Sequence, residues 1–185
     1  MALNVENAKI GPKLTLLPFI IKAAVAALKA FPAFNSSLDG DELIFKRYYH
    51  IGFAADTPDG LIVPVIRNAD TKGLNEIAED AVRLAGEARA GKLKLGDMQG
   101  ATFTVSSLGG IGGTNFTPII NAPEVAILGM TRAQTKPVWD GGAFQPRLIQ
   151  PVSLSWDHRV VDGVAAARFL VTLCRVLADF RRISL

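Results

Sequence analysis

The sequence has a single cysteine, Cys174, which excludes an internal disulfide and is typical of a protein kept in a reducing compartment. Its place on an apolar helical face predicts a buried, unreactive thiol. Long hydrophobic runs are also missing. The longest, residues 14–28, is interrupted by Pro18 and Lys22 and is shorter than the roughly 20 residues that a membrane span needs. Residues 1–12 lack a signal or transit pattern, so we expect a soluble, untargeted chain.

Clusters of charge and of metal ligands are missing as well. The net charge is +3, and no basic cluster is larger than Lys46-Arg47 or Arg181-Arg182. Such scattered charge does not predict a nucleic-acid surface. No group of Cys, His, Asp and Glu residues has the spacing of a metal site, so we expect no zinc or iron centre.

Apolar residues make up 49% of the 185 residues, which is enough for the core of a single domain. Apolar residues at helical spacing predict helices over 15–31, over 73–90 and after Gly163. Alternating or continuous apolar runs predict several strands between these helices. The strands are expected at 48–55, 61–66, 101–106, 125–129, 132–139 and 144–155. Strands interleaved with three long helices predict an α/β fold, a two-layer sandwich with a mixed β-sheet.

The segment 153–163, Ser-Leu-Ser-Trp-Asp-His-Arg-Val-Val-Asp-Gly, carries the best candidate for catalysis. His158 falls on the short link between the end of a strand and the final helix, where reactive groups are often held. A histidine can act as a base near neutral pH, and Asp162, four residues on, could orient it. The alternative is that Asp157 and Asp162 only cap the helix and that His158 is a surface residue.

Ser106 and Ser107 end a predicted strand, ahead of the glycine-rich run 109–113. That run lacks the ending of a P-loop and the helix of a dinucleotide site, and neither serine lies in a Gly-x-Ser-x-Gly elbow. A hydroxyl at a strand end can instead donate a hydrogen bond to a developing oxyanion. The alternative is a serine that satisfies its own backbone. His50, inside a predicted strand, is interpreted as structural.

The histidine motif 157–163 combined with Ser106-Ser107-Leu108-Gly109 resembles the catalytic domain of dihydrolipoamide acyltransferases, the core components of 2-oxo acid dehydrogenase complexes. Within that family the chain is most similar to the acetyltransferases of bacterial pyruvate dehydrogenase complexes. Chloramphenicol acetyltransferases share the histidine motif but not the other matching stretches. Those stretches are 16–18, 34–38, 56–61, 63–67, 121–129 and 137–141.

The resemblance implies a chloramphenicol acetyltransferase-like fold and transfer of an acetyl group between the thiols of a lipoyl-lysine and coenzyme A. It implies His158 as the base, Ser106 as the oxyanion donor and Asp162 as the residue that holds the loop and the histidine. The adjacent Ser107 leaves the register of the serine open. Both thiol compounds are substrates, the residues that contact coenzyme A are not identified, and no metal is required.

The resemblance also implies a bacterial cytoplasmic homotrimer whose serine and histidine come from neighbouring subunits. The trimers assemble into a large cubic or icosahedral core, in which Ile183 and Leu185 resemble the contact between trimers. The core is served by lipoyl domains and, indirectly, by the dehydrogenase components, without nucleic acid or membrane.

Residues 13–185 match the catalytic domain, whereas residues 1–12 are expected to form a non-matching arm in place of the family's first strand and helix. Lipoyl and peripheral-subunit-binding domains are not part of this sequence, which is therefore interpreted as an N-terminally shortened core. Three alternatives stay open: a non-catalytic assembly core, an acyltransferase for succinyl or branched-chain groups, and an antibiotic O-acetyltransferase.

Overall fold

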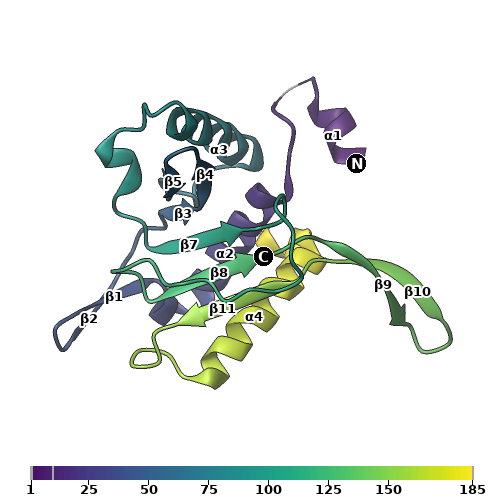
Figure 1. Cartoon of the computed structure of the whole chain (residues 1–185). Helices are drawn as coiled ribbons and strands as arrows, with labels where there is room; N and C mark the ends of the chain where they lie inside the picture. Colours follow the sequence, from purple (N-terminus) through teal and green to yellow (C-terminus); the bar gives the residue numbers. More distant parts are fainter. Residues whose placement is uncertain (1, 10, 185) are drawn as a thin grey trace.

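The computed structural model describes residues 2–9 and 11–184, which form a mixed five-stranded sheet with helices against it. The strand order is β11–β8–β7–β3–β6. Strands β3, β7 and β8 run parallel, whereas β6 and β11 run antiparallel to their neighbours at the two edges (Figure 1). The sheet consists of β3 (Ile51–Phe53), β6 (Val65–Ile66), β7 (Phe103–Ser107), β8 (Ala126–Met130) and β11 (Val152–Trp156). The predicted α/β sandwich with a mixed sheet is confirmed.

Helices α2 (Leu16–Ala30) and α4 (Gly163–Ala178) pack against each other and against the sheet (Figure 1). Both occur within a residue or two of their predicted places, because their apolar residues recur at helical spacing. Phe169 of α4 is fully buried and stacks on Phe34 with 4.4 Å between ring centroids. Helix α3 (Leu74–Arg89) packs against α2 and covers the β6 end of the sheet.

Three two-stranded hairpins extend from this body. They are formed by β1 (Ser36–Asp39) with β2 (Glu42–Phe45), β4 (Ala55–Thr57) with β5 (Gly60–Ile62), and β9 (Gln134–Trp139) with β10 (Phe144–Ile149). Figure 1 shows β1–β2 and β9–β10 projecting at opposite ends of the sheet.

Two predicted strands are each divided in two. The segment 61–66 contains β5 and β6, which separate before Pro64, and the segment 144–155 contains β10 and β11, which separate before Pro151. Proline has no N–H to donate to a partner strand, and Pro64 and Pro151 both lie in the unpaired breaks between these strands. β10 therefore stays in its hairpin, while β11 joins β8 in the main sheet.

The N-terminal segment differs from the simple arm that we expected. It contains a short helix, α1 (Ala2–Asn7), and Asn4 anchors it, since its side chain donates to the Leu14 carbonyl at 2.9 Å and accepts from the Leu14 N–H at 2.7 Å. Cys174 also differs from expectation, because its side chain is exposed. α4 turns this position away from the buried stripe. Within the described residues, no helix is long and apolar enough to span a membrane.

Candidate active site

His158 lies on the turn that joins β11 to α4, as the sequence predicts. The turn is closed by hydrogen bonds from the N–H groups of Val160 and Val161 to the carbonyl of Asp157, at 3.0 and 3.1 Å. The Asp157 N–H donates to the Val125 carbonyl at 2.8 Å and so ties the turn to the start of β8. The His158 ring is exposed and makes no hydrogen bond within the described part of the chain. Its imidazole nitrogens are thus open to a ligand or to another protein surface.

The two aspartates of the motif have different local partners. Asp162 is the N-cap of α4, and its Oδ1 accepts the Ala165 N–H at 2.7 Å. The alternative that this aspartate caps the helix therefore holds for Asp162. Asp157 instead pairs with the Arg159 guanidinium, and the Arg159 Nη2 lies 2.6 Å from the Asp157 Oδ2. Hydrogen bonds from Arg159 lower the pKa of the Asp157 carboxyl. Neither carboxylate contacts the His158 ring, so in one chain Asp162 fixes the turn by stabilising the helix that follows.

Ser106 and Ser107, at the end of β7, differ in exposure and in bonding. Ser107 is exposed, and its Oγ accepts the Gly109 N–H at 3.4 Å, as expected of a serine that satisfies local backbone. Ser106 is half-buried and its hydroxyl makes no hydrogen bond within the described chain. Both serines line a cavity of about 470 Å³. Both hydroxyls keep a hydrogen to donate, and Ser106 differs in being half-buried and free of any local hydrogen bond among the described residues.

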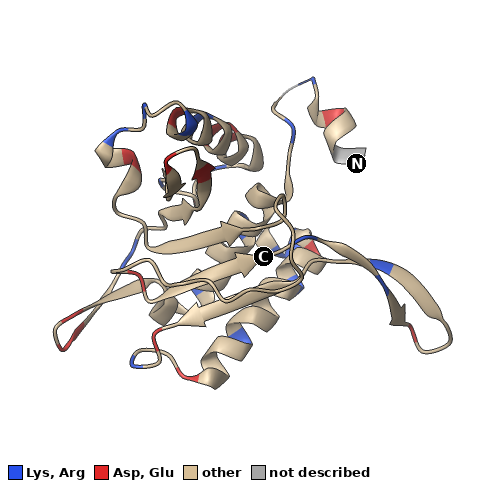
Figure 2. Cartoon of the chain, in the orientation of Figure 1, with Lys and Arg blue, Asp and Glu red and all other residues tan. Residues whose placement is uncertain are grey.

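Strands β7, β8 and β11 contain no charged residue, but Asp56 of β4 lines the Ser106 cavity. β7, β8 and β11 read Phe-Thr-Val-Ser-Ser, Ala-Ile-Leu-Gly-Met and Val-Ser-Leu-Ser-Trp. Figure 2 shows the same strands without charge, and acidic residues at the tip of the β1–β2 hairpin. A hydroxyl fixed at a strand end stabilises a developing negative charge by hydrogen bonding, whereas the Asp56 carboxylate on the cavity wall opposes such a charge.

Ser106 and His158 lie at opposite ends of the strands: Ser106 is near the end of the central strand β7, and His158 follows the end of the edge strand β11, which runs the other way. Ser106 pairs with Gly129 of β8, which pairs with Ser153 of β11. β11 then runs antiparallel and ends at Trp156, before the histidine turn (Figure 1). Ser106 and the end of β11 at Trp156 are two strand spacings apart, which is about 10 Å across the sheet. The three residues from Ser153 to Trp156 add about 10 Å along the strand. A single chain therefore does not bring its own serine and histidine together.

His158 lines a different cavity from Ser106. This second cavity, of about 570 Å³, is bounded by the histidine turn and by the segment before β8. Ile120 lines both cavities, so one stretch of chain separates them.

Glu124 is the functional candidate that the sequence did not reveal. Its side chain is 6% exposed, and burial raises the pKa of its carboxyl to about 7, although hydrogen bonds from Thr104 and Asn121 act in the opposite direction. Nothing in the sequence distinguishes a lone glutamate before an apolar strand from a surface residue.

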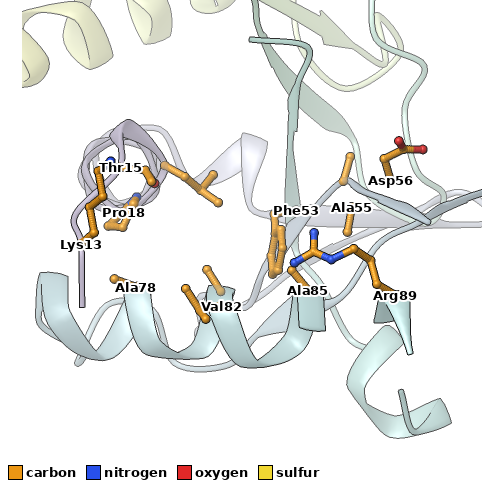
Figure 3. Close-up of a pocket in the computed structure, with 13 residues that line it drawn as sticks. Lys13, Thr15, Pro18, Phe53, Ala55, Asp56, Ala78, Val82, Ala85 and Arg89 are labelled. Carbon is orange, nitrogen blue, oxygen red and sulfur yellow. The ribbon is translucent and has the colours of Figure 1, made fainter. Parts of the chain in front are cut away.

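A third cavity, of about 320 Å³, lies between α2 and α3 (Figure 3). Val82 and Ala85 of α3 and Pro18 of α2 line it, together with the cationic side chains of Lys13 and Arg89. It contains neither Ser106 nor His158, so it is not the place of the reaction that we expect. Throughout residues 2–9 and 11–184, no group of His, Cys, Asp and Glu side chains is arranged to hold a metal ion.

Comparison with known proteins gives a family model that matches residues 1–185, including the twelve that we expected to lie outside the family pattern. Its description is 2-oxoacid dehydrogenases acyltransferase (catalytic domain). The dihydrolipoyllysine-residue acetyltransferase component of the pyruvate dehydrogenase complex of Cupriavidus necator is 63% identical over 185 residues. That match covers the whole chain but only 34% of the relative.

Solved structures give the same result. The dihydrolipoamide acetyltransferase of Azotobacter vinelandii is 59% identical with a TM-score of 0.96, covering 100% of this chain and 78% of that one. It was solved in a study of the role of a serine, a histidine and an asparagine in its catalytic mechanism. The cubic core of a pyruvate dehydrogenase multienzyme complex matches with the same values. A chloramphenicol acetyltransferase, at 15% identity and a TM-score of 0.60 over 88% of this chain and 78% of that one, shows the shared fold alone.

Proposed function

Because the chain belongs to the family of 2-oxoacid dehydrogenase acyltransferase catalytic domains, we propose that it transfers an acetyl group between dihydrolipoamide and coenzyme A. The chain spans about a third of the length of its Cupriavidus necator relative, and that relative is an acetyltransferase of the pyruvate dehydrogenase complex. The observation that carries the proposal is the pair of unbonded groups, the Ser106 hydroxyl and the His158 imidazole, each in its own cavity. Both coenzyme A and the lipoyl-lysine of a lipoyl domain act as substrates. The reaction takes place in the cytoplasm.

In this proposal His158 is the general base. A thiol is mostly protonated near pH 7, so its proton must leave as the sulfur attacks the thioester carbon. The neutral imidazole accepts that proton and later returns it to the departing thiol. The turn that carries His158 is held by the Asp157–Val125 hydrogen bond on one side and by the Asp162 cap of α4 on the other. Asp162 thereby keeps the histidine in place without receiving the proton.

Ser106 is the oxyanion donor in this proposal. Attack on the thioester forms a tetrahedral intermediate with a negatively charged oxygen, which a fixed hydroxyl stabilises. The serine, histidine and asparagine studied in the Azotobacter vinelandii enzyme have the same spacings as Ser106, His158 and Asp162. This agreement favours Ser106 over Ser107. The third position differs, since aspartate stands here for asparagine, but either residue can accept the backbone N–H of an N-cap.

The site is completed by a second copy of the chain. The two reactive groups lie at opposite ends of the strands and two strands apart, so a neighbouring copy must supply one of them. A closed ring of three copies repeats that contact three times, which is the homotrimer that the family resemblance implies. We propose that such trimers assemble into a cubic core, like the related structure. Ile183 packs on the core of its own chain, and Leu185 lies outside the described residues.

The test is acetyl transfer from acetyl-CoA to dihydrolipoamide, measured together with the size of the particle by light scattering. We expect transfer in an assembly of three or more chains, and its loss in His158→Ala. Succinyl-CoA and a branched-chain acyl-CoA serve as alternative acyl donors, and chloramphenicol serves as an alternative acceptor. A well-folded assembly without transfer would contradict the proposal and favour a structural core.

A further inference from the structure

The carboxyl group of Glu124 is buried in the segment that separates the two cavities. Its Oε1 accepts the Thr104 hydroxyl at 2.8 Å and the Asn121 amide Nδ2 at 3.0 Å. Its Oε2 is buried and has no partner among the described residues. Burial of a carboxyl group is unfavourable unless both oxygens are hydrogen-bonded, so this position carries a cost that a surface residue would not have.

The partners of Glu124 connect it to both half-sites. Thr104 lies two residues before Ser106 on β7, so the two side chains are on the same face of the strand. Asn121 lines the Ser106 cavity, and Glu124 itself lines the His158 cavity. The next residue, Val125, accepts the Asp157 N–H of the histidine turn. One carboxyl thus lies between the strand of the serine and the turn of the histidine.

The stretch that Glu124 anchors has no helix or strand of its own. Residues 117–125, which we call the partition, include Ile120, the residue that lines both cavities. Such a segment keeps its place only through the hydrogen bonds and packing of a few residues. At its C-terminal end, the hydrogen bond from Thr104 to Glu124 joins the partition to β7, and the hydrogen bond from Asn121 to Glu124 holds the partition's own bend.

We propose that Glu124 is a positioning residue: its carboxyl holds the partition against β7 and thereby sets the shape of the cavities that bind the two thiol substrates. The inference rests on the proposed acetyl transfer. Burial favours the neutral form of the carboxyl, whose pKa of about 7 means that it is about half ionised at neutral pH. An ionised, buried carboxylate would draw water and loosen the partition.

The titratable side chains that line the same cavities define the surroundings of this carboxyl. They are Asp157, His158 and Arg159 in the His158 cavity, Asp56 in the Ser106 cavity, and Lys46 and Tyr48 in the neighbouring cavity. The raised pKa has burial as its first cause, and the only opposing causes are the hydrogen bonds from Thr104 and Asn121. A variant that stays neutral at position 124 therefore isolates the effect of Glu124 from the titration of these neighbours.

The experiment compares the full chain with Glu124→Gln, Glu124→Ala and Thr104→Val. In wild type, the KM for acetyl-CoA should rise above pH 7 as Glu124 ionises. Glu124→Gln keeps an acceptor oxygen but cannot ionise. Its KM should therefore stay within about twofold of the wild-type value below pH 7 and should not rise above pH 7. Glu124→Ala removes the side-chain link between the partition and β7, and misplacement of this kind should raise KM about tenfold or more. Thr104→Val should fall between them. Thr102→Val is the matched control. It removes a buried hydroxyl two residues before Thr104, and that hydroxyl donates to the His50 carbonyl rather than to Glu124.

Hydrogen exchange of residues 117–125, compared between variants at pH 6 and again at pH 8, tests the inference independently of catalysis. Faster exchange in Glu124→Ala than in Glu124→Gln and Thr102→Val supports it. Equal exchange in all variants overturns it, whether or not the protein transfers acetyl groups. Faster exchange with an unchanged KM also overturns it, because Glu124 would then be merely structural. A wild-type chain that shows the expected exchange but no transfer would contradict the proposed function alone.

Discussion

Two inactive variants should restore activity to each other if Ser106 and His158 of one site come from different chains. Ser106→Ala loses the oxyanion donor and His158→Ala loses the base, so each variant alone should be at least about 10²-fold slower than wild type. When the two are unfolded together in equal amounts and refolded, mixed trimers form. Some of their sites then receive an intact serine from one chain and an intact histidine from its neighbour.

The expected size of this recovery follows from the geometry. A site is intact only if the chain that supplies the serine is a His158→Ala chain and the chain that supplies the histidine is a Ser106→Ala chain. With random mixing each condition is met half of the time, so about a quarter of wild-type activity should return. Within one chain such a site is excluded, because the two residues lie two strands apart and at opposite ends of the strands.

The assay is acetyl transfer from acetyl-CoA to dihydrolipoamide, before and after joint refolding. A mixture of Ser106→Ala with the double variant, which contains no intact serine, is the control and should stay inactive. Activity of the joint preparation equal to the mean of the two parents would refute the shared site, provided that native mass spectrometry shows mixed trimers.

Three further predictions concern single residues. Ser106→Ala should lower kcat by about 10²- to 10³-fold, while Ser107→Ala changes it little, in steady-state assays; equal losses would contradict the assigned register. Glu124 binds its proton more tightly in the folded chain, where the pKa of its carboxyl is about 7, than in the unfolded chain, where the pKa is 4.5. The stability that this proton provides is therefore complete below about pH 4.5 and is lost as the pH rises to about 7. The free energy of unfolding in urea should fall by about 3 kcal/mol more in wild type than in Glu124→Gln over that interval, and parallel curves would disprove the shift. Phe169→Ala should lower the free energy of unfolding by about 3–5 kcal/mol, since it removes a fully buried ring that stacks on Phe34 and leaves a cavity. A loss under about 1 kcal/mol would show that the core refills the space.

The helices and the histidine turn were predictable from the sequence because they depend on short-range patterns. Apolar residues at helical spacing mark α2, α3 and α4, and Asp162 followed by Gly163 marks the start of α4. Strand boundaries were less predictable. The apolar pattern continues across Pro64 and Pro151, and only the pairing in space shows that the strands on either side belong to different sheets.

By itself, the sequence determined the residue types that this chemistry needs and their local setting: a histidine on a strand-to-helix turn and a serine at a strand end. The tertiary structure decided where these groups lie relative to one another. Because β11 runs antiparallel to β8, it places His158 at the opposite end of the strands from Ser106, a result of strand order and direction that no local motif contains. The structure also decided the character of Glu124, since a carboxyl acquires a raised pKa only when residues distant in sequence bury it.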